Sequence, residues 1–288
     1  MRDYIKLFRV KHYIKNALLY IPIFFDGNIF NPLFSGKLFL GFIAFCSISS
    51  AVYILNDLKD MEQDQKHPVK KNRPIASGRI SKTRAIIICM LCIFGAVFLG
   101  KSACRENSLG LLYIVGYFAL NVLYSGGLKN IPLVDIVILA SGFVIRVFYG
   151  AFLADVTVSG WLYLVIITGA LYMGLGKRRN ELGKYKTVSN GTRTRKVLDY
   201  YSYAFLDKNM YVCVALVNVF YSLWVMELSD ARVRWTIPLF IIILMKYSLS
   251  IEREDSDGDP VEVIMRDKGL LALIVIYGIS LLVFIYLI

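Results

Sequence analysis

Residues 38–57 read LFLGFIAFCSISSAVYILND, an apolar run whose only charged residue is Asp57 at its end. A helix needs about 20 mostly apolar residues to cross a bilayer, which is the length of this stretch. The run lacks the period-two alternation of apolar and polar residues that a membrane-spanning strand requires. It therefore predicts a transmembrane helix, because a helix bonds its own backbone polar groups inside the lipid.

The composition extends this interpretation to the whole chain. Of the 288 residues, 57% are hydrophobic and 19% are charged, and the mean hydropathy is +0.58. One soluble core cannot cover so much apolar surface, so a cytosolic enzyme and a disordered chain are excluded. We expect an all-α, polytopic membrane bundle that forms a single domain over residues 1–288. Its spans should number about nine, at residues 14–34, 38–57, 84–100, 108–124, 131–153, 159–176, 203–228, 235–251 and 269–288.

The basic residues predict the orientation of this bundle. The net charge is +12, from 33 Lys and Arg against 21 Asp and Glu. With nine spans and a cytoplasmic N-terminus, 26 of the 33 basic residues face the cytoplasm, which agrees with the positive-inside rule. We therefore expect an integral protein of the plasma membrane whose long polar loops, residues 58–83 and 177–202, are cytoplasmic. The five basic residues on the opposite side are Lys37, Lys101, Arg105, Arg232 and Arg234.

Three acidic residues follow the second span. Asp57, Asp60 and Asp64 are spaced at i, i+3 and i+7, which places them on one face if the helix continues. Stacked carboxylates repel one another unless a cation lies between them, and oxygen ligands suit Mg²⁺. The alternative is a solvated helix end in which Lys59 and Lys66 alternate with the acids. The spacing favours the metal site.

A basic loop comes directly after these acids. Lys and Arg beside a Mg²⁺–carboxylate site are suited to hold a diphosphate. The alternative is ordinary positive-inside flanking or contact with anionic lipid, and the residue types leave the two readings balanced. The basic residues are Lys66, Lys70, Lys71, Arg73, Arg79 and Lys82.

Three motifs of the first half resemble the UbiA superfamily of intramembrane prenyltransferases. The segment NDLKDMEQD at 56–64 resembles that family's first aspartate motif, and KNRPIASG at 71–78 is similar to the N-R-P segment that follows it. The segment YSGGLK at 124–129 resembles the family's Y-S-x-x-L-K element. The resemblance implies a helical membrane enzyme that uses a diphosphate substrate with Mg²⁺.

The second half departs from the usual prenyl-diphosphate enzymes of this family. Where they carry a second aspartate motif, residues 176–182 read GKRRNEL, with one acid and three bases. That element resembles the branch of the family that contains decaprenyl-phosphate phosphoribosyltransferase. The segments RVKHYIKN at 9–16 and GDPVEVIMRD at 258–267 are similar to the same branch, the latter with Val261 where a Glu is common.

This branch implies transfer of phosphoribosyl from 5-phosphoribosyl 1-diphosphate to a polyprenyl phosphate, with Mg²⁺ held by Asp57, Asp60 and Asp64. A polyanionic donor needs a basic cup, and the lipid acceptor needs an apolar slot open to the bilayer. Because the lipid phosphate is already an anion, no strong general base is required, and we assign no catalytic role to His12 or His67. The expected catalytic residues are Asn56, Asp57, Asp60, Asp64, Lys177, Arg178 and Glu181, and the expected substrate-binding residues from these motifs and loops are Lys15, Asn16, Lys66, Arg73, Tyr124, Lys129, Arg266 and Asp267.

Two charged residues lie within a predicted span. Asp135 and Arg146 are costly in lipid and are therefore candidate functional residues. They are eleven residues apart, about three turns, so they and Tyr149 should share one helix face. Arg146 could reach a lipid phosphate or pair with another helix, and Asp135 could bind Lys129 or substrate. All three are assigned to substrate binding.

Two other functions compete with phosphoribosyl transfer. A prenyltransferase for aromatic or quinone-precursor acceptors would use the same aspartates for prenyl diphosphate, but the second aspartate motif is missing. A transporter or lipid-binding protein would explain the spans but not the register of Asp57, Asp60 and Asp64. The basic charge is explained by topology and anionic substrates, so nucleic acid is not an expected partner, whereas the lipid bilayer is and a homo-oligomer is left open.

Overall fold

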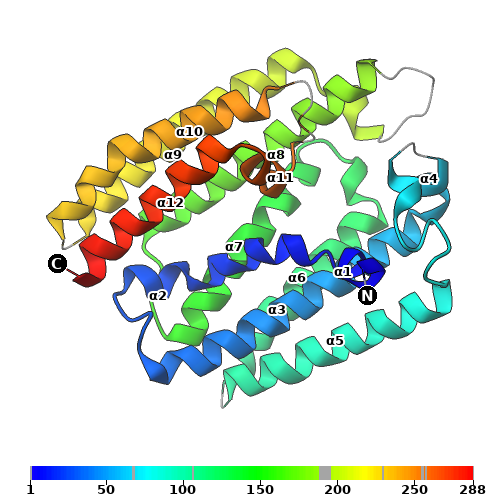
Figure 1. The fold of residues 1–288 in the computed structure, drawn as a ribbon, viewed down its shortest axis with the longest axis horizontal. Coiled ribbons are helices and arrows are strands. Elements are labelled where there is room, and N and C mark those ends of the chain that lie inside the picture. The colour runs from blue at the N-terminus through cyan, green and yellow to red at the C-terminus, as the bar shows by residue number, and fades with distance from the viewer. Residues whose placement is uncertain are drawn as a thin grey trace. The chain divides into compact units, whose positions relative to one another are not determined.

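The structure is a computed structural model of the 288-residue chain, and its regular elements are helices throughout the described part (Figure 1). It describes residues 2–66, 69–105, 107–187, 196–228, 230–253, 256 and 258–287, with only the backbone at 184–187. The α-helices are α1 (Arg2–Phe8), α2 (Ile21–Phe25), α3 (Pro32–Lys59), α4 (Met61–Lys66), α5 (Lys82–Cys104), α6 (Leu111–Gly126), α7 (Val134–Ala154), α8 (Gly160–Thr187), α9 (Tyr203–Glu227), α10 (Thr236–Ile251), α11 (Pro260–Arg266) and α12 (Lys268–Leu282). The 3₁₀ helices are η1 (Val10–Tyr20), η2 (Lys70–Asn72), η3 (Ser108–Gly110), η4 (Leu128–Asn130), η5 (Lys196–Tyr200) and η6 (Ala231–Trp235), and η7 (Val283–Leu287) is a π-helix.

Eight helical segments in the described residues are long and apolar enough to cross a membrane. They coincide with the second to the ninth predicted spans, and the predicted all-α membrane fold is confirmed. The protein is therefore an integral membrane protein. The segments are Pro32–Lys59, Lys82–Cys104, Ser108–Gly126, Val134–Ala154, Gly160–Gly183, Tyr203–Glu227, Ala231–Ile251 and Lys268–Leu287.

The first predicted span, residues 14–34, has a different form from the other eight. Its residues form the later part of the 3₁₀ helix η1, the five-residue helix α2 and the first residues of α3. Helix α2 ends at Phe25, and Gly27 follows at a φ of 77°. A 3₁₀ helix rises about 2.0 Å per residue, so η1 and α2 together extend about 30 Å, close to the thickness of the hydrocarbon core. This segment runs beside α3 from α1 to α2 (Figure 1). The expected number of about nine crossings is approximately met.

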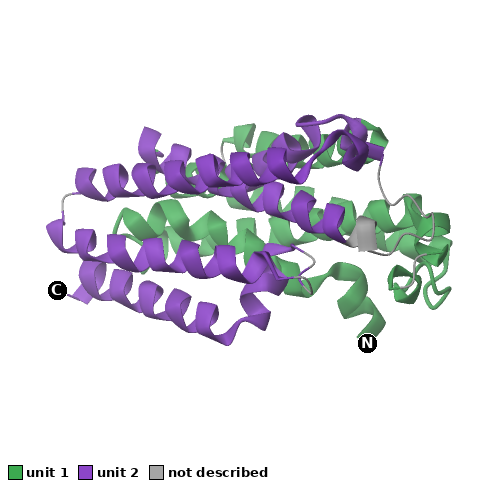
Figure 2. Ribbon diagram, turned by 90° about the horizontal axis from the view of Figure 1, so that it is seen from above, with its two compact units in different colours: residues 1–127, 145–157 green, residues 128–144, 158–288 purple. Residues whose placement is uncertain are grey.

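The chain divides into two compact units (Figure 2). Unit 1 contains residues 1–127 and 145–157, and unit 2 contains residues 128–144 and 158–288, so that α7 contributes to both. Each unit has its own cluster of buried apolar side chains. The loop 58–83 belongs to unit 1 and the loop 177–202 to unit 2, with residues 67–68 and 188–195 outside the described residues. That the chain forms one domain stays a prediction.

Helix α3 is the central helix of unit 1. It packs against α5, α6 and η1. In its apolar 18-residue stretch 61% is buried, against 22% in the corresponding stretch of α5. Small residues such as Ala44 and Ala51 are fully buried on α3, whereas Met90 and Phe94 of α5 are exposed. Exposed apolar side chains on a spanning helix suit contact with lipid. This packing fixes the polar end of α3, which carries Asp57.

A close approach in unit 1 gives a test of this packing. A methyl group added to Gly150 of α7 would lie 1.8 Å from the carbonyl oxygen of Leu19. We expect Gly150→Ala to lower the free energy of unfolding by about 1–3 kcal/mol, because backbone atoms cannot move aside cheaply. Thermal unfolding in detergent measures this loss.

The control is Gly95→Ala in α5, where an added methyl group meets nothing within 4 Å. We expect no loss there, and a gain of up to about 1 kcal/mol from the better helix former. A Gly150→Ala protein as stable as the wild type would contradict the close contact between α7 and η1.

Candidate functional site

The acidic cluster of unit 1 lies where α3 gives way to α4. The backbone stays nearly helical there, because the Asp60 N–H donates to Asn56 and the Asp64 N–H donates to the Asp60 carbonyl. Asp57 and Asp64 therefore lie close together, and each is only 3% exposed. Buried carboxylates need a charged partner, so the end of this helix is a place where a cation is held.

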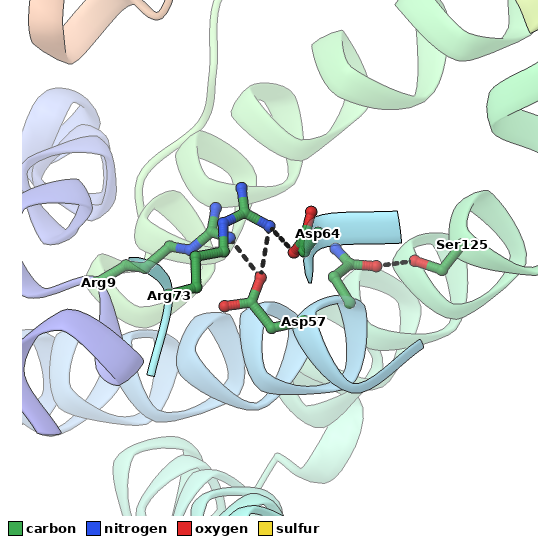
Figure 3. A network of polar contacts seen from close by, with 6 residues as sticks. Arg9, Asp57, Asp64, Arg73 and Ser125 are labelled. Atoms are coloured by element: carbon green, nitrogen blue, oxygen red, sulfur yellow. Dashed lines mark hydrogen bonds and ion pairs between the residues drawn. The ribbon is translucent and has the colours of Figure 1, made fainter. Parts of the chain in front are cut away.

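Arg73 supplies that positive charge. Its Nη1 donates to Asp57 Oδ1 at 3.0 Å and to Asp64 Oδ2 at 2.7 Å, so one guanidinium bridges both carboxylates (Figure 3). Arg9 donates to the same Asp57 Oδ1 at 2.6 Å. Its guanidinium also lies 4.5 Å from the centre of the Tyr53 ring. Two arginines, from the N-terminal arm and from the basic loop, thus converge on one aspartate.

The loop that carries Arg73 is held by its own sequence. Ile75 is 2% exposed and anchors the loop in the core of unit 1. Gly78 adopts a φ of 74°, which favours glycine, and its N–H donates to the Ile75 carbonyl at 3.1 Å. Ile80 N–H donates to the Pro74 carbonyl at 3.0 Å and closes the turn. The NRPIASG segment thereby directs Arg73 towards the aspartates.

The donor set fits a divalent ion in part. Asp57 and Asp64 are brought together. Among the described residues, however, no three His, Cys, Asp or Glu side chains lie near enough to one another to hold a metal ion. Asp60 caps α3 through its backbone, and its part in a three-carboxylate site stays a prediction. Arg73 lies where a cation would neutralise both acids, which is the charge environment that Mg²⁺ requires.

A second set of contacts joins α3 to α6. Ser125 Oγ is hydrogen-bonded to Asn56 Oδ1, and Lys59 Nζ donates to the Ser125 carbonyl at 2.5 Å. Tyr124 of the same motif is 8% exposed. A groove of about 440 Å³ runs between the two helices here, lined by Val52, Leu55, Leu58, Lys59, Asn121, Val122, Ser125 and Gly126.

Arg146 is buried in the core of unit 1. Its Nε donates to Asn16 Oδ1 at 2.8 Å and its Nη2 to Tyr117 Oη at 3.1 Å. The guanidinium also lies over the Phe45 and Tyr117 rings, at 5.1 and 4.9 Å from their centres. Asn16 and Arg146 of the predicted site therefore meet, and Tyr149 is fully buried near Phe45. A substrate role for these residues and for Lys15 stays a prediction.

The polar network of unit 2 centres on Arg178. Its Nε donates to Asp135 Oδ2 at 2.5 Å, and its Nη1 donates to Glu181 Oε2 at 2.6 Å. The side chains of Asp135 and Arg178 are both 0% exposed, and that of Glu181 is 23% exposed. Tyr201 donates to the other oxygen of Asp135 at 2.6 Å. Asp135 and Arg146 therefore have different partners, in unit 2 and unit 1 respectively.

The predicted late-loop residues, Arg266 and Asp267, lie where α11 ends and α12 begins. Asp267 caps α12 by accepting from the Gly269 and Leu270 N–H groups, each at 3.0 Å. Ser250 donates to it at 2.5 Å, and Lys246 forms an ion pair with it at 3.0 Å. The Ser250 and Leu270 hydrogen bonds hold the pKa of Asp267 well below its usual range.

The remaining candidates are basic residues in four different elements. Arg266 and Lys66 are exposed, and Lys129 lies in η4 of unit 2. Lys177 lies in α8 directly before Arg178, and His67 is outside the described residues. The roles of Lys66, Lys129, Lys177 and Arg266 stay predictions.

Sequence reasoning had not assigned roles to Arg9, Ser125 or Tyr201. Arg9 stood in a quoted motif, but its left-handed backbone, at a φ of 50°, and its contact with Asp57 are not readable from spacing. Ser125 also stood in a quoted motif, and Tyr201 was surrounded by no motif at all.

Comparison with known proteins supports the same family. The model of the UbiA prenyltransferase family matches residues 27–265. The chain belongs to the UbiA prenyltransferase family. The resemblance noted in the motifs is thereby confirmed.

Curated relatives within the UbiA family resemble nearly the whole chain. Decaprenyl-phosphate phosphoribosyltransferase of Corynebacterium glutamicum is 33% identical over 98% of this chain and 86% of its own length. The protein of the same name from Mycolicibacterium smegmatis is 30% identical over 92% of this chain and 87% of its own length.

Solved structures agree with the UbiA fold. A UbiA homologue from Archaeoglobus fulgidus bound to GPP and Mg²⁺ is 18% identical, with a TM-score of 0.72 over 97% of this chain and 99% of that chain. The same homologue bound to DMAPP and Mg²⁺ gives a TM-score of 0.73, at 18% identity over 97% of this chain and 98% of that chain. At this identity the likeness establishes the fold alone.

Proposed function

We propose that this UbiA-family protein transfers phosphoribosyl from 5-phosphoribosyl 1-diphosphate to a polyprenyl phosphate. The observation that carries the proposal is the buried pair Asp57 and Asp64 bridged by Arg73, with Arg9 on the same carboxylate. The two relatives named decaprenyl-phosphate phosphoribosyltransferase support the choice of substrates.

In this proposal the acidic cluster binds the diphosphate end of the donor. Asp57 and Asp64 would hold Mg²⁺, with Asp60 as a further ligand. The bound ion would neutralise charge on the diphosphate and make it a better leaving group. Arg73 and Arg9 would then turn their guanidinium groups from the carboxylates to phosphate oxygens, for which their planar geometry is suited.

The reaction needs little acid–base chemistry from the chain. An oxygen of the lipid phosphate forms a bond to the anomeric carbon, the bond from that carbon to the diphosphate breaks, and the diphosphate leaves with the electron pair. Both the attacking phosphate and the leaving group are anions, so the protein contributes binding, orientation and positive charge.

The membrane supplies the acceptor. A polyprenyl chain is soluble only in the bilayer, whereas the donor is soluble in water. The excess of basic residues on the side that carries residues 58–83 and 177–202 supports a cytoplasmic site in the plasma membrane. The N-terminus would lie on the same side.

The main rival is prenyl transfer from a prenyl diphosphate to an aromatic acceptor. The solved homologue from Archaeoglobus fulgidus is bound to prenyl diphosphates and Mg²⁺. In this chain the place of a second aspartate motif is taken by Lys177, Arg178 and Arg179, which disfavours a second carboxylate clamp.

A transfer assay separates the two reactions. Purified protein is given radiolabelled 5-phosphoribosyl 1-diphosphate and polyprenyl phosphate, with Mg²⁺ or with EDTA. We expect label in the organic phase with Mg²⁺ and none with EDTA. No organic-phase label with Mg²⁺, together with a product from prenyl diphosphate and an aromatic acceptor, would reject the proposal in favour of its rival.

Lys177 is the proposed phosphate contact of unit 2. Lys177→Ala is expected to raise the KM for the donor about 10-fold and leave the KM for the lipid unchanged, because one charge–phosphate contact is lost. Initial rates at varied donor and varied lipid measure both constants. An effect confined to the lipid KM would reassign Lys177 to the acceptor.

A further inference from the structure

Tyr201 joins two parts of unit 2 through one hydroxyl group. Its Oη donates to Asp135 Oδ1 at 2.6 Å and accepts the Leu133 N–H at 2.7 Å. The phenol therefore uses both its donor and its acceptor capacity, and Tyr201 is only 7% exposed. Burial, and the hydrogen bond to Asp135, raise the pKa of Tyr201, so the phenol keeps its proton at neutral pH.

The turn that Tyr201 holds is strained. Leu133 has a φ of 66°, a conformation that L side chains with bulk at Cγ rarely adopt. The first turn of α7 carries Asp135, whose N–H donates to the Ile131 carbonyl at 3.2 Å. By binding the Leu133 N–H, the phenol stabilises the backbone that starts α7 and orients the carboxylate.

That carboxylate in turn holds α8 at Arg178. Asp135 has both oxygens bound, one by Tyr201 and one by Arg178 Nε. Arg178, held in this way, also orients Glu181, because its Nη1 donates to the Glu181 carboxylate at 2.6 Å. The chain of contacts thus leads from a fully buried ion pair to a carboxylate that reaches the surface, at 23% exposure.

The same turn of α8 is also held by residues 251 and 258. Asn180 Nδ2 donates to the Ile251 carbonyl at 2.7 Å. A methyl group on Gly258, whose φ is 73°, would lie 2.7 Å from Lys177 Cα, so the loop before α11 packs directly on this turn. Residues 177–181 are therefore fixed on two sides, which is the arrangement expected for groups that must be held in one geometry.

We infer that Tyr201 is a positioning residue, which acts through Asp135 and Arg178 to fix Glu181 and the neighbouring Lys177 for contact with the donor. The inference rests on the proposed function, because it assigns these two residues to the phosphoribosyl donor. In this inference Arg178 acts through its contacts with Asp135 and Glu181 and not by touching the donor.

The test is Tyr201→Phe, which keeps the ring stacked on Phe205, 5.9 Å away, and removes the hydroxyl. We expect kcat/KM for the donor to fall about 10- to 100-fold, since small displacements of positioning groups have effects of this size. The KM for the lipid should stay unchanged. The matched control is Tyr200→Phe, because Tyr200 is 73% exposed, and it should behave as the wild type.

Double-variant cycles separate positioning from a general loss of stability. If Tyr201 acts through the network, Tyr201→Phe should add little to the loss caused by Asp135→Asn or by Glu181→Gln. The partly exposed Glu181 keeps the test available should Asp135→Asn fail to fold. Additive losses, an equal rise in the lipid KM, or an unchanged donor kcat/KM in Tyr201→Phe would overturn the inference.

The wild type in the same assay tests the proposed function separately. A wild type that forms no product from 5-phosphoribosyl 1-diphosphate would remove the proposed function and this inference together. An active wild type with a fully active Tyr201→Phe would remove the inference alone.

Discussion

Asp57→Asn is expected to lower the rate of phosphoribosyl transfer on the order of 10²- to 10³-fold, the size seen when one preorganised electrostatic contact is removed. Asn keeps the shape of the side chain but removes its charge. Arg9 and Arg73 both contact Asp57 Oδ1, and the proposed Mg²⁺ would lose an anionic ligand. Asp64→Asn should act in the same direction, because Asp64 shares Arg73.

Single-turnover and steady-state rates with Mg²⁺ measure this effect, together with thermal unfolding to show that the variant is folded. The matched control is Asp26→Asn, which makes the same change at an exposed aspartate that accepts a hydrogen bond from the Asn28 side chain. Asp60→Asn tests the third predicted ligand and should lower turnover to a similar extent. Full activity in both Asp57→Asn and Asp60→Asn would remove the metal-site hypothesis.

Arg178→Ala should destabilise the protein by about 3–5 kcal/mol, the cost of leaving one buried charge without its partner. Its guanidinium and the carboxylate of Asp135 are both fully buried. Unfolding in detergent measures the loss. The neighbouring Arg179→Ala is the control, because its ion pair with Asp207 is partly exposed and should contribute no more than about 1 kcal/mol.

A double replacement divides stability from activity. Arg178→Met combined with Asp135→Leu removes both charges and fills similar volume, so it should recover most of the lost stability. Transfer should remain low, because Glu181 would lose the Arg178 contact. A stable Arg178→Ala protein would contradict the burial of this ion pair.

The spanning helices were predictable because lipid imposes a length and a composition on them. The exception is residues 14–34, where the apolar residues predicted one helix and the chain forms η1 and α2. An apolar run does not report the rise per residue, and a 3₁₀ helix needs fewer residues for the same distance. The division into two units was also not predictable from the hydropathy of the sequence.

The acidic half of the site was predictable because its residues are close in sequence. The spacing of Asp57 and Asp64 places them on one helical face, and Arg73 follows within the same loop. Arg9 and Tyr201 were not assigned, since 48 residues separate Arg9 from Asp57 and 66 separate Tyr201 from Asp135. Contacts over such separations depend on the tertiary fold, which local spacing does not encode.

Charge in a span was a sound signal of an unusual residue but a poor guide to its partner. The spacing of Asp135 and Arg146 suggested one shared face of α7. The structure pairs Asp135 with Arg178 and surrounds Arg146 with Asn16 and aromatic rings. Contacts with other protein groups and contacts with a substrate both compensate a buried charge. The cost of burial alone therefore does not tell a structural residue from a substrate-binding residue.

The most direct test of phosphoribosyl transfer is the mass of the lipid product. Wild-type protein in lipid nanodiscs is given polyprenyl phosphate, 5-phosphoribosyl 1-diphosphate and Mg²⁺, and the extracted lipid is analysed by mass spectrometry. We predict a lipid heavier by one phosphoribosyl group, with one diphosphate released for each lipid converted. Unchanged polyprenyl phosphate, from protein that prenylates an aromatic acceptor in a parallel reaction, would contradict it.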